Sequence, residues 1–319
     1  MKRVLVSGAT GLIGQAIVKV LLRENEHVIA LVRSIERAES ILGKANKNLE
    51  YIIGDICDIE PKNINVDYII HGASQTSSRA FIEEPIETIT TALLGTKNML
   101  EFARINDVKG FVYLSSMEVY GSPLKDLKID EKHETNLDTM KVRSCYPESK
   151  RMCESLCASY FSEFGVPAKV VRLTQTFGPG VKYNDGRVFA EFARCVIERR
   201  NIVLKTKGET KRSYLYIEDA VNAILTVLYN GISGEAYNAA NEETYCSIYE
   251  MAKMVANKFG NNSVEVLIEE TDAEKLGYAP VLQMNLDTTK ICDLGWRAKF
   301  NLESMFQNMI EDMKMNQKR

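Results

Sequence analysis

The residues KRVLVSGATGLIG, at positions 2–14, decide the fold of this chain. Residues 2–6 are a short β-rich run, and Gly8, Gly11 and Gly14 follow at a spacing of three. From residue 12 to residue 24 the apolar positions recur with helical periodicity. A strand, a glycine turn and a helix N-terminus form an anion site, because free backbone N–H groups and the helix dipole face the ligand. The stretch predicts a turn that holds a dinucleotide pyrophosphate. The expected contact residues are Gly8, Thr10, Gly11, Leu12, Ile13 and Gly14.

The alternation of strands and helices continues through the first half of the chain. Repeated βα units with continuous apolar strands indicate a parallel sheet that helices cover on both faces. We predict an α/β protein, with a Rossmann doubly wound parallel sheet in residues 1–173. Residues 174–319 are expected to form mainly a smaller α/β substrate-binding domain, with some segments returning to the first sheet. Further strands are expected at 28–32, 49–53, 67–71, 111–115 and 169–173, and further helices at 35–42, 87–106, 148–164 and 302–313.

Composition narrows the class of protein. The 319 residues include 43 acidic and 40 basic side chains, mixed along the chain, so nucleic acid and anionic membranes are not expected partners. Seven cysteines without framework spacing indicate a reducing compartment. No apolar run is long enough to span a membrane, and we expect a cytoplasmic protein. Cys153 and Cys157 would share a helix face, where core packing is favoured over a dithiol or metal pair, and no metal site is expected.

The end of the second strand bears on the choice of cofactor. Dinucleotide folds often place an acidic residue there, where it binds the ribose hydroxyls and repels a 2′-phosphate. This chain has Val32 and Arg33 instead, with Ser34 and Arg37 close behind, and these residues favour NADP(H) over NAD(H). The alternative is that Arg33 is a solvated loop charge.

The sequence GDICD follows the third expected strand. Asp55 could accept a hydrogen bond from the adenine amino group, with Ile56 beside it. It could equally cap a turn or a helix.

A proton-transfer pair is predicted in CYPESK. Tyr146 and Lys150 are four residues apart, so they would lie on one face of a helix that has Pro147 in its first turn. A tyrosine pKa of about 10 is too high for proton exchange near neutrality, and a nearby positive charge would lower it. Ser115 and Ser116 end the preceding strand, where a hydroxyl could orient a reacting carbonyl.

The motifs SGATGLIG, YLSSMEVYG and YPESK, in this order, resemble those of the extended short-chain dehydrogenase/reductases that modify nucleotide sugars. The resemblance runs from residue 1 to about residue 300. It implies that Ser116, Tyr146 and Lys150 are the catalytic residues, and that Tyr146 and Lys150 also contact the cofactor. It further implies a homodimer formed through helix 148–164 and the helix near 90–105.

One position departs from the dehydratases of this family. The resemblance places Met117 where those enzymes have an acid, and a thioether cannot protonate a leaving hydroxyl. A dehydratase is therefore disfavoured. Glu118 is left as an auxiliary base or as a polar group at the pocket floor.

The second half carries the residues that would bind a nucleotide-diphosphate sugar. By its position in KRSYLY, Arg212 resembles the arginine that family members place against the substrate diphosphate, and Arg187 is a second candidate. Gln175 stands where the family often has asparagine. The segment GYAPVLQMNLDTTK, residues 277–290, lacks an arginine found in many members.

These expectations lead to an NADPH-dependent reductase of a keto-sugar nucleotide, such as a 4-keto-6-deoxyhexose, in polysaccharide or deoxysugar biosynthesis. A 4-epimerase with tightly held NAD, resembling UDP-glucose 4-epimerase, is the first alternative, and decarboxylation or another redox step follows. A regulator of the same fold that senses NADP is the least favoured, because such proteins tend to lack the tyrosine and lysine pair.

Overall fold

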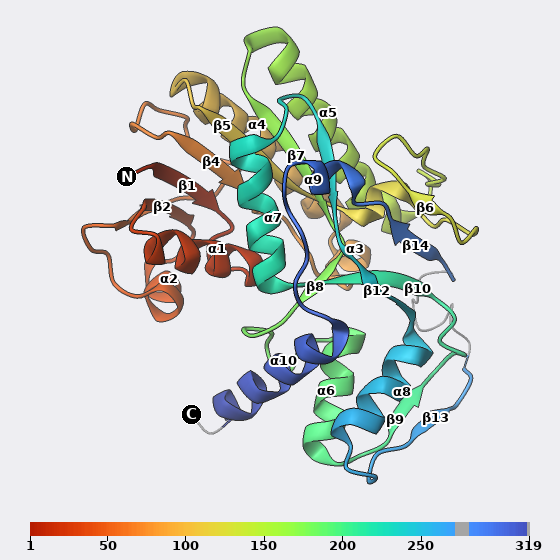
Figure 1. Ribbon diagram of the computed structural model, residues 1–319. Coiled ribbons are helices and arrows are strands. Elements are labelled where there is room, and N and C mark those ends of the chain that lie inside the picture. The colour runs from red at the N-terminus through yellow and green to blue at the C-terminus, as the bar shows by residue number, and fades with distance from the viewer. Residues whose placement is uncertain (272–280, 318–319) are drawn as a thin grey trace.

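A seven-stranded parallel sheet forms the centre of the computed structural model (Figure 1), which describes residues 1–271 and 281–317. The strand order is β11-β7-β5-β4-β1-β2-β3. Register pairs such as Val4 with Val28, and Val4 with Tyr68, place the first strand in the middle of the sheet. Its strands are β1 Arg3–Ser7, β2 His27–Val32, β3 Leu49–Ile53, β4 Tyr68–His71, β5 Gly110–Ser116, β7 Ala168–Leu173 and β11 Ala236–Ala239.

Helices cover both faces of this sheet, because its strands bury apolar side chains in both directions. Val4 packs into the core with α1 and α7, whereas its neighbour Leu5 packs into the core with α4 and α5. The predicted α/β fold with a doubly wound parallel sheet is confirmed. The covering helices are α1 Leu12–Arg23, α2 Ile35–Leu42, α4 Pro85–Ile105, α5 Cys145–Phe164 and α7 Ile217–Asn230.

A second, five-stranded sheet is formed mainly by the second half of the chain. Helices α6, α8 and α10 lie below the large sheet in Figure 1. These three helices share one apolar core, to which Phe189, Met251 and Phe306 contribute. The strands are β6 Lys128–Ile129, β8 Gln175–Phe177, β10 Lys211–Tyr216, β12 Asn241–Ser247 and β14 Gln283–Leu286, with β9 Ile202–Leu204 and β13 Val266–Ile268 forming a separate pair. The helices are α6 Val188–Glu198, α8 Ile248–Phe259 and α10 Leu302–Gln317.

The two sheets exchange segments. Strand β11 comes from the second half of the chain but pairs with β7, whereas β6 comes from the first half but pairs with β14. Each half of the chain therefore contributes a strand to the sheet formed mainly by the other half. The remaining short elements are α3 Ala80–Glu83, the 3₁₀ turns η1 Met117–Tyr120 and η2 Val142–Ser144, and α9 Thr289–Asp293.

The predicted element bounds differ from the observed ones by at most four residues, the largest change being the end of α10, and the change that affects the site is the start of α5. That helix begins at Cys145, three residues before the expected start, so Tyr146 already belongs to its first turn. Pro147 permits this, because the first-turn N–H groups have no partner within the helix. In the part of the chain that the structure describes, no helix is long and apolar enough to cross a membrane.

Candidate active site

The glycine turn lies too close to neighbouring backbone to accept side chains. Gly8 has a φ of +71°, and a Cβ there would lie 2.7 Å from the carbonyl carbon of Gly72. A Cβ on Gly14 would lie 2.1 Å from the oxygen of Gly8, so the helix and the strand approach more closely than any other residue allows. Gly11 precedes α1 without a side-chain cap. The first N–H groups of this 12-residue helix are thus open to an anion, as a dinucleotide pyrophosphate requires.

Two arginine side chains lie near the end of β2, one directly after the strand and one in α2. Val32 is buried, whereas Arg33 and Arg37 are exposed, and neither guanidinium has a hydrogen bond or an ion pair within residues 1–271 and 281–317. Ser34 caps α2, since its hydroxyl accepts a hydrogen bond from the N–H of Arg37 at 3.2 Å. Both arginines are therefore available to a phosphate, which is the condition that the NADP prediction needs.

The carboxylate of Asp55 caps the turn that follows β3, which is one of the two roles that the sequence left open. Its Oδ1 accepts a hydrogen bond from the N–H of Cys57 at 2.9 Å. Ile56 is buried and packs on α4, where a Cβ on Gly95 would lie 3.0 Å from it. A contact of Asp55 or Ile56 with adenine stays a prediction.

The three expected catalytic residues meet where β5 ends and α5 begins. The ammonium of Lys150 lies 5.8 Å from the ring centre of Tyr146 and donates a hydrogen bond to the carbonyl of Leu114 at 2.8 Å. The hydroxyl of Ser116 faces the Tyr146 phenol closely enough to lower the pKa of that phenol. The helical spacing and the strand end thus bring phenol, ammonium and hydroxyl together, as general acid/base catalysis requires.

Burial determines the ionisation of this group. It raises the pKa of Tyr146 well above the usual value, the Glu118 carboxylate raises it further, and Ser116 and Arg143 lower it. Burial also lowers the pKa of Lys150 to about 8. In this surrounding the phenol holds its proton at neutral pH, so removing that proton requires an additional positive charge beside the ring.

The structure distinguishes the two adjacent serines. Ser115 donates a hydrogen bond to Glu154 at 2.5 Å, so it is committed to a buried network and not to Tyr146. In that network Glu154 pairs with Arg172 at 2.7 Å, and Arg172 donates to the hydroxyl of Tyr120. These residues join β5, β7 and α5 and so fix the helix that carries Tyr146.

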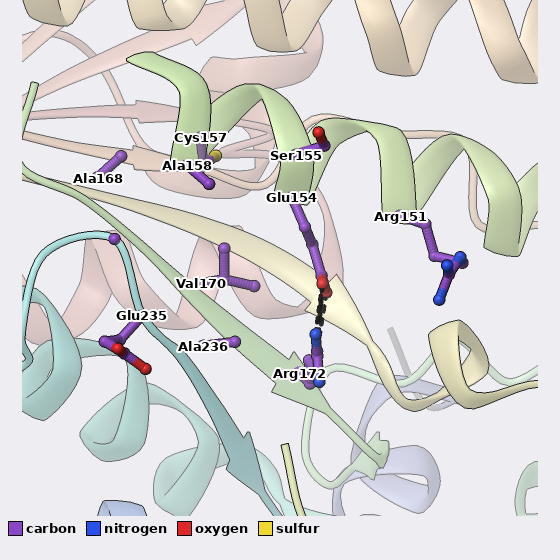
Figure 2. Close-up of a pocket in the computed structure, with 11 residues that line it drawn as sticks. Arg151, Glu154, Ser155, Cys157, Ala158, Ala168, Val170, Arg172, Glu235 and Ala236 are labelled. Atoms are coloured by element: carbon purple, nitrogen blue, oxygen red, sulfur yellow. Dashed lines mark hydrogen bonds and ion pairs between the residues drawn. The ribbon is translucent and has the colours of Figure 1, made fainter. Parts of the chain in front are cut away.

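A pocket of about 330 Å³ lies beside this ion pair, between α5, β7 and β11 (Figure 2). Figure 2 shows Glu154 of α5 and Arg172 of β7 pointing toward each other, with Arg151 further along the helix. Neither the glycine turn nor Ser116, Tyr146 or Lys150 lines this pocket. The candidate active site is therefore the region at the ends of the parallel strands, and not this pocket.

Two residues that sequence reasoning missed complete the surroundings of Tyr146. Arg143 forms a two-pronged ion pair with Glu118, at 2.8 and 3.2 Å. Phe81 stacks on the Tyr146 ring at 4.3 Å between ring centres. The position of Arg143, three residues before Tyr146, could have drawn attention to it, whereas no motif contains Phe81.

Two of the three expected substrate residues, Arg212 and Gln175, lie in the second sheet, and Arg187 directly precedes α6. Arg212 is half-buried in β10, and within the described residues its buried Nε has no hydrogen-bond partner, as expected of a group that awaits a ligand. Gln175 is in β8, which pairs with β10. Arg187, by contrast, forms an ion pair with Asp185 at 2.7 Å. Of segment 277–290, residues 277–280 lie outside the described part, and Met284 is buried in β14 directly beside Arg212.

The thiols of Cys153 and Cys157 pack in the core, which is the role that the sequence favoured over a dithiol or metal pair. Cys153 donates a hydrogen bond to the carbonyl of Ala92, and Cys157 lies in the same core. Within the described residues, no group of three histidine, cysteine or acidic side chains could hold a metal ion.

The sequence is similar to those of known proteins. The family model for the NAD dependent epimerase/dehydratase family matches residues 4–240. The chain is 30% identical over 318 residues to UDP-glucuronic acid decarboxylase 5 of Arabidopsis thaliana, covering 98% of this chain and 89% of that protein.

Solved structures show the same fold. UDP-glucose 4-epimerase of Thermotoga maritima, solved with UDP-glucose, has a TM-score of 0.83 at 22% identity, covering 99% of both chains. UDP-glucuronic acid 4-epimerase of Bacillus cereus, solved with UDP-glucuronic acid and NAD, has a TM-score of 0.82 at 20% identity, covering 98% of this chain and 99% of that chain.

Proposed function

This chain belongs to the NAD dependent epimerase/dehydratase family of extended short-chain dehydrogenase/reductases, and we propose on that premise that it oxidises and re-reduces a nucleotide-diphosphate sugar. The observation that carries the proposal is the meeting of Ser116, Tyr146 and Lys150 at the same edge of the parallel sheet as the glycine turn before α1. The family assignment confirms the expected enzyme class. A purely regulatory role is disfavoured, because this set of side chains serves proton transfer.

The chain's own residues divide the work as follows. Tyr146 removes the proton from a sugar hydroxyl and later returns it to the carbonyl oxygen, while Ser116 donates a hydrogen bond to that oxygen. Lys150 supplies positive charge beside the phenol. The glycine turn and the start of α1 hold the pyrophosphate of the dinucleotide. When bound, the nicotinamide accepts or donates the hydride and, in its oxidised form, adds a positive charge near Tyr146.

On the substrate side, Arg212 binds the diphosphate through its unpartnered Nε. Gln175, one strand away, is positioned to support the same group. Arg187 would first have to leave Asp185 and is therefore the weaker candidate. These roles, and a cytoplasmic location, are part of the proposal.

The named relatives change the order of the expected reactions. A decarboxylase and two 4-epimerases stand among the similar proteins, and none of the three is a keto-sugar reductase. Decarboxylation of a uronic acid and 4-epimerisation can both begin with oxidation at the sugar and end with return of the hydride. We therefore place a redox-neutral conversion with retained NAD ahead of NADPH-dependent reduction.

Reduction stays the second candidate because of one specific observation. Arg33 and Arg37 are exposed, and their guanidinium groups have no hydrogen-bond or ion-pair partner in the described residues. Position 32 holds a valine in place of the acidic residue that would bind the ribose. A 2′-phosphate suits this arrangement better than a free ribose. An enzyme that consumes NADPH would have use for such a site.

One experiment separates the candidates. The nucleotide that co-purifies is released by denaturation and identified, and the protein is then incubated with UDP-glucose or UDP-glucuronic acid without added cofactor. We expect bound NAD and catalytic formation of an epimer or, with loss of CO₂, a pentose nucleotide, with Tyr146→Phe as the inactive control. Product formation that consumes one NADPH per turnover would establish the reductase instead. Failure of every sugar nucleotide would contradict the proposed class.

A further inference from the structure

Arg143 lies on the 3₁₀ turn η2, immediately before the helix that carries Tyr146. Its Nη1 donates to Oε2 of Glu118 at 2.8 Å and its Nη2 to Oε1 at 3.2 Å. A planar fork that meets a carboxylate in this way fixes both orientation and charge. The pair is about one-third exposed on either side, at 32% for Arg143 and 28% for Glu118.

The same guanidinium also contacts the wall of the active site. Its carbon lies 5.4 Å from the ring centre of Phe81, and Phe81 stacks on Tyr146. The thiol of Cys145 donates a hydrogen bond to the Phe81 carbonyl at 3.3 Å. Turns η1 and η2 and helices α3 and α5 therefore meet around the Tyr146 ring. We name Glu118, Arg143 and Phe81 the Tyr146 surround.

We propose that Arg143 is a positioning residue: by neutralising Glu118 next to the phenol, and by resting on Phe81, it keeps Tyr146 able to lose its proton. The inference goes beyond the proposed function, although its importance for turnover rests on Tyr146 being the proton-transferring group there. Arg143 acts through its neighbours and needs no contact with the reacting atoms.

The charges that face Tyr146 support this role. Besides burial, the carboxylate of Glu118 raises the pKa of the phenol, whereas Ser116 and Arg143 lower it. Among the described residues, further ionisable neighbours are the ammonium of Lys150, the phenol of Tyr113 and the thiol of Cys145. Removing Arg143 would leave an unpaired anion beside a group that must itself become an anion.

Stabilisation of the fold is a weaker explanation for the ion pair between Arg143 and Glu118. Ion pairs at this exposure stabilise proteins little, because both partners remain largely solvated. Local electrostatics at Tyr146 is therefore the effect that a substitution should reveal.

The test is a titration of Tyr146 in the protein saturated with NAD⁺ and without sugar. Tyrosines are labelled with ¹³C at Cζ, and the Tyr146 signal is assigned by its loss in Tyr146→Phe. We expect Arg143→Met to raise the midpoint of ionisation by about one pH unit and Glu118→Gln to lower it by a similar amount. The double variant should return close to the parent value, and Arg143→Lys should restore most of the shift.

The outcomes are decisive in both directions. Unfolding temperatures within a few degrees of the parent show that the variants are folded. Equal Tyr146 signals in parent and Glu118→Gln up to about pH 10.5, or a double variant no closer to the parent than Arg143→Met, would overturn the proposal. Since no sugar is present, this result is independent of whether the proposed reaction takes place.

Discussion

The phenol ring of Tyr146 lies flat against the ring of Phe81, with 4.3 Å between ring centres and 13° between ring planes. Both rings are buried, and Phe81 belongs to a four-residue helix 65 positions earlier in the chain. The stack fixes the plane of the phenol, so its hydroxyl can approach Ser116 and a substrate from few directions. This contact makes the active site more rigid than the catalytic motif alone would.

Tyr146→Phe keeps this stack and removes only the oxygen that carries the proton. We expect kcat to fall by about 100- to 10,000-fold, the usual contribution of a general acid/base, while the affinity for NAD changes little. Steady-state rates and cofactor titrations measure the two effects. A variant that turns over its substrate at the parent rate would remove Tyr146 from the mechanism, and Glu118 and Cys145 would be the next side chains to test.

Arg33→Ala should weaken NADPH binding by about 10- to 100-fold and leave NADH binding nearly unchanged, because a charge-assisted contact to a 2′-phosphate is lost. Fluorescence titration with both cofactors checks this. The matched control is Arg23→Ala, since Arg23 is an exposed arginine at the far end of α1. Equal losses for NADPH and NADH would show that Arg33 does not recognise the phosphate.

Arg212→Ala should raise the KM for the sugar nucleotide by about 10- to 100-fold, because a charged contact to the diphosphate is lost. Cofactor affinity should stay within about a factor of two of the parent. Arg187→Ala is the comparison, and its smaller expected effect reflects the ion pair with Asp185. If cofactor binding is lost selectively, Arg212 has been assigned to the wrong ligand.

His71 predicts a loss of stability in mild acid. Burial lowers its pKa to about 3, and its ring nitrogens are hydrogen-bonded to Ser7 at 2.7 Å and Thr96 at 3.0 Å. The unfolded chain binds a proton near pH 6.5 and the folded one does not, so stability is full above that pH and falls below it. The expected loss is about 1.4 kcal/mol per pH unit, or about 2 kcal/mol from pH 6.5 to 5.

Urea unfolding between pH 7 and pH 5 measures this effect. His71→Asn should be less stable at pH 7 but show a flatter dependence on pH. The same slope in both proteins would assign the acid sensitivity to other groups.

We propose a homodimer formed through α4 and α5, whose outer faces expose large apolar side chains. Burying such a patch is favourable in water, so two copies should associate. Leu94→Asp combined with Met152→Asp should give a monomer in analytical ultracentrifugation, whereas Ile232→Asp, outside these helices, should not. A monomeric parent protein at micromolar concentration would contradict the proposal. The exposed residues are Ile86, Leu94, Ile105, Met152, Phe161 and Phe164.

Much of the fold could be predicted from the sequence, because the signals are local. The expected strand 49–53 and helix 35–42 match β3 and α2 in the structure. Strand alternation, helical periodicity and glycine turns each depend on residues within about one element of one another. The same locality explains why Tyr146 and Lys150 could be predicted as a pair, since two residues four positions apart on a helix share a face.

The sequence alone could not choose between alternatives that depend on distant partners. The strand end alone offered both Ser115 and Ser116, the family resemblance favoured Ser116, and the structure shows that Ser115 is hydrogen-bonded to Glu154. Asp55 was equally a ligand or a cap, and the folded turn shows the cap, in which Oδ1 accepts a hydrogen bond from the N–H of Cys57, while its contact with adenine stays a prediction.

The sequence by itself determined the class of fold, the glycine turn and the three side chains that we propose as catalytic. Only the tertiary structure decided their surroundings: Glu118 meets Arg143 from 25 residues away, and Phe81 meets Tyr146 from 65. Such contacts form because the parallel sheet brings the ends of distant strands to one edge. Their charges and rings act on Tyr146 through space, so no spacing along the chain encodes them.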